Sequence, residues 1–167
     1  MDDYLLKDVR SLLHLATEDK LVSLMKLLAV QIGNLINYAE LSISCGLPYR
    51  NLSKHLEILK QTYILDILRP YLRNKRTEIK KNPKVFFVDS GFRNMLLSDM
   101  RSLEKRENAG SLIENHVYSA IRRSDNDFKT VNFWRTRNGA EVDFVLEKAG
   151  EIIPIEVKYS KNPGIGK

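Results

Sequence analysis

The stretch that decides the fold is GAEVDFVLEKAGEIIPIEVKYS, residues 139–160. It contains two apolar runs in which charged residues alternate, separated by a short turn at Gly150, and this pattern is typical of a β-hairpin. If Asp143 lies opposite Glu156, the apolar side chains of both strands share one face and the charged ones share the other. Gly150 then supplies the positive φ that a tight turn needs. We predict this register rather than a two-residue slip, which would place Pro154 opposite Asp143.

The charged face of this hairpin has two interpretations. Asp143 and Glu156 would repel each other at neutral pH unless a cation lay between them, and their oxygen atoms suit Mg²⁺ or Mn²⁺. Lys158 points to the same face as Glu156, where it could hold a metal-bound water or stabilise charge on a phosphate. The alternative is a solvated sheet face, on which Glu141 pairs with Lys158 and the other acids contact water.

One helix and two further strand segments complete the C-terminal part. The segment SLIENHVYSAIRRS is amphipathic, with Ser111 as its expected N-cap and Glu114 three residues later in capping-box spacing. Alternating apolar residues predict strands over residues 130–137, 140–147 and 151–160.

The N-terminal half has a different pattern. Leucines at helical spacing predict a core-facing helix over residues 19–32. A helix that ends near Gly46 and another that begins around Pro48 are separated by a tight Gly-Leu-Pro turn, as in a helix-turn-helix. Two strands follow, over residues 64–72 and 84–89, and a polar loop joins them. This order is typical of a winged helix, with the loop as its wing.

Basic residues gather on this wing and on the second helix of the pair, where they share the surface opposite the leucines with Asn51 and His55. Such density is an electrostatic footprint for a phosphate backbone. The alternatives are a solvated loop and a protein-interaction surface. The candidate nucleic-acid-binding residues are Arg50, Asn51, Lys54, Arg73, Lys75, Arg76, Lys80, Lys81 and Lys84.

The composition indicates the type of partner and the cellular compartment that we expect. The 167 residues include 27 Lys and Arg against 21 Asp and Glu, a net charge of +6 that favours a polyanionic partner such as DNA. The single Cys45 excludes an internal disulfide framework and a cysteine-rich zinc site, and we expect it to be a buried apolar residue. Without a long apolar run or a signal peptide, we expect a cytoplasmic protein that does not enter a membrane.

Several motifs together resemble a known family. Asp143 followed by Glu156-Val157-Lys158 is similar to the PD-(D/E)XK nuclease superfamily. More closely, PKVFFVDSGFRNML, SLIENHVYSAI, FWRTRNGAEVDFVLE and IPIEVKYS resemble the C-terminal region of prokaryotic AAA+ ATPases, catalogued as domain of unknown function 4143, in which a winged helix precedes a nuclease-like domain. The resemblance implies that Asp143 and Glu156 are metal ligands, Lys158 is the catalytic lysine, and Glu114 is an additional acid. The capping box remains the alternative role for Glu114.

The expected fold is α/β of the α+β kind. We predict a winged-helix domain over residues 1–98, a linker over 99–109, and a PD-(D/E)XK nuclease-like domain over 110–167 that has one helix and three strands and is incomplete at its C-terminus. The expected function is a DNA-binding nuclease-like module of an AAA+ ATPase that hydrolyses phosphodiester bonds with Mg²⁺ or Mn²⁺. The alternative is a non-catalytic DNA- or protein-interaction module. No P-loop motif is present, so we expect no nucleotide binding here and an ATPase domain or another protein as a partner.

Overall fold

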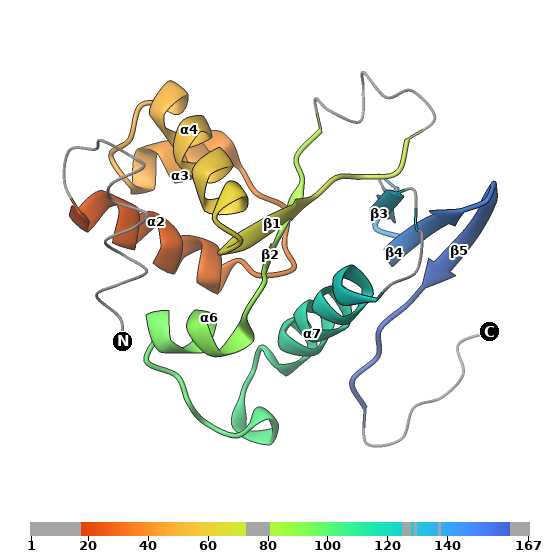
Figure 1. Cartoon of the computed structure of the whole chain (residues 1–167). Coiled ribbons are helices and arrows are strands. Elements are labelled where there is room, and N and C mark those ends of the chain that lie inside the picture. The colour runs from red at the N-terminus through yellow and green to blue at the C-terminus, as the bar shows by residue number, and fades with distance from the viewer. Residues whose placement is uncertain (1–17, 73–80, 125–127, 129, 137, 161–167) are drawn as a thin grey trace.

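The protein has a mixed α+β fold with five helices, one 3₁₀ turn and two small antiparallel sheets in the part that the structure describes (Figure 1). A computed structural model describes residues 18–72, 81–124, 128, 130–136 and 138–160. Three N-terminal helices lie on one side of a central hairpin, and a long helix with a three-stranded sheet lies on the other. Among the described helices, none combines the length and apolar character needed to cross a bilayer.

The N-terminal part consists of α2 (Glu18–Val30), α3 (Tyr38–Ser44) and α4 (Tyr49–Gln61). α3 begins after Asn37, whose side chain accepts hydrogen bonds from the backbone N–H groups of Ala39 and Glu40. α4 begins directly after Pro48, which has no N–H group to satisfy. The expected helix that ends near Gly46 and the one that begins around Pro48 are therefore confirmed.

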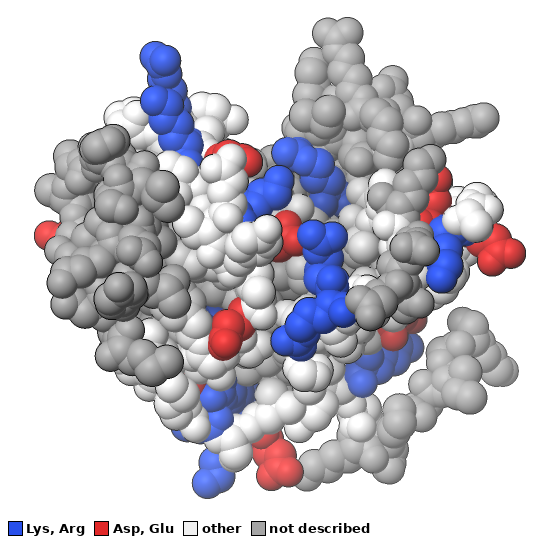
Figure 2. All heavy atoms as spheres, in the orientation of Figure 1, with Lys and Arg blue, Asp and Glu red and all other residues white. Residues whose placement is uncertain are grey.

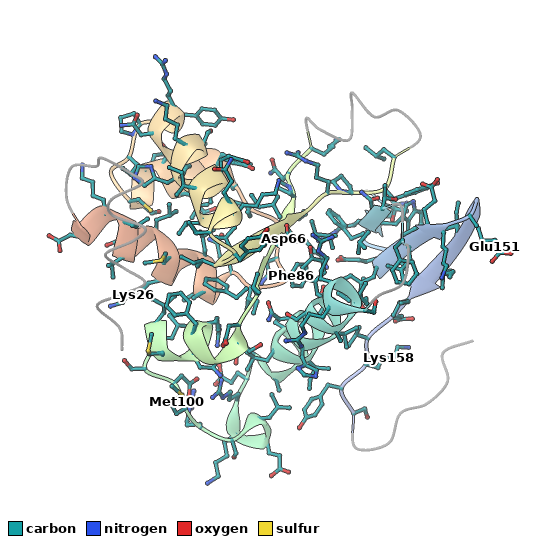
Figure 3. The ribbon with its side chains drawn as sticks, viewed as in Figure 1. Lys26, Asp66, Phe86, Met100, Glu151 and Lys158 are labelled. Carbon is teal, nitrogen blue, oxygen red and sulfur yellow. The ribbon has the colours of Figure 1, made fainter. Side chains whose placement is uncertain are left out.

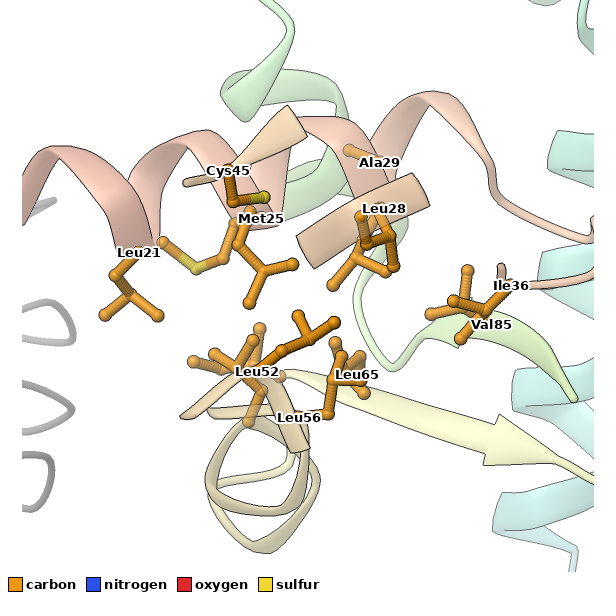
Figure 4. Packing of buried hydrophobic residues seen from close by; sticks show 14 of the residues in the cluster. Leu21, Met25, Leu28, Ala29, Ile36, Cys45, Leu52, Leu56, Leu65 and Val85 are labelled. Atoms are coloured by element: carbon orange, nitrogen blue, oxygen red, sulfur yellow. The ribbon is translucent and has the colours of Figure 1, made fainter. Parts of the chain in front are cut away.

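The apolar faces of these helices form the first core (Figure 4). Each fully buried leucine contributes about 1.5–3 kcal/mol through removal of its surface from water. Cys45 is buried in this core, as predicted. His55 is a correction: it is only 1% exposed, and its Nδ1 lies 2.5 Å from the backbone oxygen of Asn51, so it does not belong to the outer surface of α4. The labelled core residues are Leu21, Met25, Leu28, Ala29, Ile36, Cys45, Leu52, Leu56, Leu65 and Val85.

The central hairpin consists of β1 (Leu65–Leu68) and β2 (Lys84–Phe87), which pair antiparallel. The predicted pair of strands is confirmed, and all four residues of β2 are buried. Most of the predicted wing, residues 73–80, lies outside the described residues.

Two short elements that we did not predict follow the hairpin, namely α6 (Ser90–Leu96) and the 3₁₀ turn η1 (Leu103–Lys105). Asp89 caps α6 by accepting a hydrogen bond from the N–H of Phe92. The buried side chain of Arg93 donates from Nε to the carbonyl oxygen of Ala29, in the last turn of α2. α6 thus satisfies a carbonyl that the end of α2 leaves open.

The C-terminal part consists of α7 (Ala109–Arg123), β3 (Thr130–Arg135), β4 (Glu141–Lys148) and β5 (Glu151–Ile155), with the strands in the order β3-β4-β5. The predicted helix followed by three strands is confirmed. The predicted capping box is wrong, because α7 begins two residues before Ser111, after Asn108. Ser111 therefore lies inside the first turn, and the side chain of Glu114 is free to reach another element.

The predicted hairpin register is confirmed. Phe144 lies opposite Ile155, and the strands meet at a two-residue turn in which Ala149 and Gly150 have φ values of 50° and 86°. Positive φ at both central residues is the geometry that follows the right-handed twist of the strands. β5 ends at Ile155, so Glu156 comes directly after the strand.

The hairpin and the C-terminal sheet share a second core. Phe86 of β2 stacks on Tyr118 of α7 with ring centroids 4.5 Å apart and lies 5.8 Å from the ring of Phe144 in β4. Figure 3 places Phe86 at the centre of the molecule. Beyond the end of β1, the N–H of Phe133 donates to the carbonyl oxygen of Arg69 at 3.1 Å. The predicted domain boundaries stay a prediction, but side chains from both predicted units build this core.

Candidate functional site

Three elements that are distant in sequence bring an acidic site together around one lysine. The ammonium Nζ of Lys84, the first residue of β2, lies 2.8 Å from Oε1 of Glu114 in α7 and 2.5 Å from Oε1 of Glu141 in β4. The other oxygen of Glu141 lies 3.4 Å from Nη1 of Arg135 in β3. Lys84 is thus held between two carboxylates at the junction of the hairpin, the long helix and the sheet.

The electrostatics of this site follow from its burial. Burial alone would lower the pKa of Lys84, but the carboxylates of Glu114 and Glu141 outweigh this effect, so its pKa is raised and the side chain stays charged. Burial raises the pKa of Glu114, Lys84 opposes this rise, and the nearby charges of Asp143 and Glu141 add to it. Removal of the ammonium group would therefore leave three carboxylates close together.

The predicted catalytic residues of the hairpin are only partly brought together. Oδ2 of Asp143 accepts a hydrogen bond of 2.7 Å from the backbone N–H of Val157, as the register allows. The side chains of Glu156 and Lys158 are 61% and 45% exposed, and they pair with each other at 3.4 Å. Figure 3 shows Lys158 on the segment that follows β5. The alternative interpretation, a solvated sheet face, paired Glu141 with Lys158, and this pair is wrong because Glu141 pairs with Lys84 and Arg135 instead.

A divalent metal ion does not fit these residues as they are arranged. Within the described part of the chain, no group of three or more His, Cys, Asp or Glu side chains is placed to hold a metal ion. Lys84 already supplies a cation to Glu114 and Glu141, and Asp143 already accepts a backbone hydrogen bond. Asp143 and Glu156 as metal ligands therefore remain a prediction from the sequence.

The predicted nucleic-acid-binding residues fall into three groups. Lys84 is a correction: it is 3% exposed and ion-paired inside the molecule, so it cannot lie on the surface of a wing. The remaining described residues are all exposed, namely Arg50, Asn51, Lys54 and Lys81. Those that lie outside the described residues are Arg73, Lys75, Arg76 and Lys80.

A groove of 690 Å³ lies between helices α3 and α4 on one side and the loop end of the β1–β2 hairpin on the other. The rings of Tyr38 and Tyr49 meet in it with centroids 5.9 Å apart, and Tyr49 is 61% exposed. Arg69 and Lys81 line the hairpin side, with Glu57 as the single acid of the lining. Burial raises the pKa of Tyr38, while the nearby charge of Arg69 opposes the rise. Figure 2 shows Lys and Arg side chains near the middle of the visible face, with Asp and Glu side chains among them.

The α4 wall of this groove is not the surface that we predicted. Tyr49, Ser53, Leu56 and Glu57 form it. Asn51 lies two positions beyond Tyr49, which is about 200° around a helix, so it lies on a different side of α4.

Sequence reasoning did not identify the tyrosines that form the groove or the lysine at the centre of the acidic site. The tyrosines gave no signal by themselves, because Tyr38 and Tyr49 begin two separate helices and meet only when these helices pack. Lys84 looked like one more residue of a basic loop. A signal was available, since it begins a run of buried residues, Lys84-Val85-Phe86-Phe87, where an unpaired charge would be costly.

Comparisons with known proteins divide the chain at one point. A family model described as Domain of unknown function (DUF8612) matches residues 1–109, and a second, Domain of unknown function (DUF4143), matches residues 109–165. Uncharacterized proteins of Mycobacterium bovis and Mycobacterium tuberculosis are each 26% identical over 139 residues, which cover 81% of this chain and 31% of theirs. An uncharacterized protein of Haemophilus influenzae is 25% identical over 163 residues, 95% of this chain and 38% of its own.

The chain therefore spans about a third of the length of these curated relatives. No solved structure is significantly similar to it. The match to the second model includes three of the four motifs on which the resemblance was based, and the first of them, at residues 83–96, lies in the match to the other model.

Proposed function

This chain belongs to the family described as Domain of unknown function (DUF8612), and we propose that it is a DNA-binding module in which the groove beside α4 holds the nucleic acid. In this proposal α2, α3, α4 and the β1–β2 hairpin form a winged helix. The long helix with the β3-β4-β5 sheet is a PD-(D/E)XK nuclease-like fold that serves as a scaffold. The observation that carries the proposal is the combination of two tyrosines and two basic side chains in one open groove.

Each component of the groove suits one part of a nucleic acid. Arg69 and Lys81 carry positive charge toward phosphates, and charge of this kind provides affinity without reading sequence. The exposed ring of Tyr49 offers a face on which a base can stack, and stacking accepts any base. A pair of aromatic rings beside basic residues favours unpaired bases, so we expect single-stranded DNA to bind more tightly than a duplex.

The larger context of this module is also part of the proposal. The similar proteins of Mycobacterium and Haemophilus influenzae are about three times as long as the segment that matches this chain. The resemblance to AAA+ ATPases supports an ATPase domain as the partner. In that arrangement the module would bring the ATPase to DNA. The chain itself contributes binding rather than nucleotide chemistry.

Substitution of Tyr49 tests the groove. We expect Tyr49→Ala to weaken binding of a fluorescein-labelled single-stranded oligonucleotide about tenfold, because one stacked base contributes about 1–3 kcal/mol. Fluorescence anisotropy at fixed salt measures the dissociation constant. The matched control is Tyr159→Ala, which removes a similarly exposed ring, 49% exposed, from the segment after β5. Equal losses in both variants, or a loss only in the control, would move the binding surface away from the groove.

Substitution of Lys81 tests the electrostatic part. In Lys81→Ala we expect the slope of log Kd against log salt to fall by about 1, because one phosphate contact and its released counterion are lost. Lys26→Ala is the control, since it removes the same charge from α2, on another part of the surface in Figure 3. An unchanged slope in Lys81→Ala, together with a reduced one in Lys26→Ala, would contradict this placement.

Metal-dependent cleavage of DNA is the second candidate function. The observation that favours it is the register of the hairpin, in which Asp143 and Glu156 directly flank the Phe144–Ile155 pair, and the Asp143 carboxylate accepts a hydrogen bond from the N–H of Val157. Nicking of supercoiled plasmid with Mg²⁺ or Mn²⁺ tests it, with Asp143→Ala and Lys158→Ala prepared identically. We expect no nicking by the parent chain above that of the variants. Nicking that both variants lose would instead establish the hairpin as a catalytic site.

A further inference from the structure

The carboxylates of the acidic site already have a cation as a partner, because Lys84 lies between them. Lys84 Nζ contacts one oxygen of Glu114 and one of Glu141, and it also lies 5.5 Å from the ring centroid of Phe133. The side chain of Lys84 is 4% exposed, and that of Glu114 is 14% exposed. An ammonium group has three donors and no acceptor, so two carboxylates and an aromatic face are suitable neighbours for it.

The backbone at Gly33, in the loop after α2, lies against the second carboxylate oxygen of Glu114. A Cβ atom at Gly33 would lie 2.9 Å from Oε2 of Glu114, closer than such contacts allow. Gly33 also has a φ of +74°, and its N–H donates to the carbonyl oxygen of Val85, the residue after Lys84. The loop after α2 thus packs against the Glu114 carboxylate and holds it toward Lys84.

The charges in the site are nearly balanced without any ion. Glu114, Glu141 and Asp143 supply three carboxylates, and Lys84 and Arg135 supply two cations. A divalent cation coordinated by Glu114 and Glu141 would have to occupy the region that the ammonium group fills. The ammonium group and a divalent cation in the same region are both positive, and they would repel each other strongly because little water is present to screen them.

We propose that the ammonium group of Lys84 takes the place of a divalent cation. The acids that resemble a nuclease centre then form a structural joint, made by the ion pairs of Lys84 with Glu114 and Glu141, which holds the β1–β2 hairpin against the C-terminal part. The joint connects the two family matches, because Lys84 belongs to the first and both glutamates belong to the second. It also adjoins the groove, since Lys81 and Asn82 line the groove just before Lys84 begins β2. Lys84 has this role whether or not the groove binds DNA.

The consequence is that divalent cations should bind only after the lysine is removed. We compare the parent chain, Lys84→Met, Lys84→Met with Glu114→Gln, and Lys84→Arg by isothermal titration calorimetry with MnCl₂. The expected result is no Glu114-dependent Mn²⁺ binding by the parent chain, one bound Mn²⁺ in Lys84→Met, and loss of that binding in the double variant. Lys84→Arg keeps the cation and should bind none.

A thermal readout accompanies the titration. Saturating Mn²⁺ should raise the Tm of Lys84→Met by about 5 °C and leave the parent Tm unchanged, because a ligand stabilises only the folded state that binds it. Circular dichroism establishes that each variant is folded.

Two outcomes would overturn the proposal. One is Mn²⁺ binding by the parent chain that Glu114→Gln abolishes, and the other is a folded Lys84→Met variant that gains no Mn²⁺ site. If Lys84→Met fails to fold, comparison of the parent chain with Glu114→Gln still decides, because the proposal requires the two to bind Mn²⁺ equally. DNA-binding measurements on the groove are independent of all these results.

Discussion

The variant Lys84→Met should unfold at a much lower urea concentration than the parent chain, with a loss of about 3–5 kcal/mol in the free energy of unfolding. Methionine retains most of the side-chain volume but removes the ammonium group from between Glu114 and Glu141. The two partly buried carboxylates then lie close together with Asp143 nearby, and Arg135, 3.4 Å from Glu141, is the cation that remains beside them. Urea unfolding followed by circular dichroism measures the change.

Two companion variants separate charge from packing. Lys84→Met with Glu114→Gln should be less destabilised than the sum of its single variants, because the Glu114 carboxylate that has lost its lysine partner is gone. Lys26→Met removes an exposed lysine and should change the free energy of unfolding by no more than about 0.5 kcal/mol. A change of this small size in Lys84→Met would mean that the lysine contributes no more than a surface charge.

The second large effect is expected at Asn115, a residue of α7 that is fully buried. Its Oδ1 accepts a hydrogen bond of 2.7 Å from the N–H of Phe87, and its Nδ2 donates to the carbonyl oxygen of Phe87 at 2.9 Å and to Oγ of Ser90 at 3.0 Å. The amide thus satisfies both backbone groups of the last residue of β2, as a neighbouring strand would.

We expect Asn115→Leu to lower the free energy of unfolding by about 2–5 kcal/mol. It leaves the buried N–H of Phe87 without its acceptor, and among the described residues it leaves the carbonyl oxygen of Phe87 with only the 3.4 Å hydrogen bond from Oγ of Ser119. Chemical denaturation measures the loss, and hydrogen exchange at the Phe87 amide reports it locally. His116→Leu, at the exposed next position, is the control. Slow exchange at Phe87 in a stable Asn115→Leu variant would contradict this account, because it would show that another group accepts the hydrogen bond of the Phe87 N–H.

The sequence predicted those parts of the fold that local pattern determines. Alternation and one glycine were enough for the β4–β5 register, because a slip would expose Phe144 and Leu146. The Gly-Leu-Pro turn located the gap between α3 and α4. α6 was missed because it has only seven residues and follows a buried strand directly, although Asp89 was a usable N-cap signal.

The candidate site was harder to predict because its residues meet only through tertiary packing. The spacing of Ser111 and Glu114 matched a capping box, but the helix begins earlier and Glu114 reaches Lys84, 30 positions away in sequence. Lys84 was assigned to the wing by composition, and only the burial of β2 shows that it faces inward. A pattern of charge gives the number of cations but not the side of the strand on which each one lies.

A titration of ¹⁵N-labelled chain with single-stranded DNA, followed by backbone amide chemical shifts in the presence of Mg²⁺, tests most directly whether the groove is the functional surface. The predicted result is that the amides of Tyr38, Tyr49, Ser53 and Lys81 shift with DNA concentration, while those from Asp143 to Lys158 stay in place. Shifts concentrated at Asp143, Glu156 and Lys158, with the groove unaffected, would contradict the account and return the nuclease-like hairpin to the centre of the function.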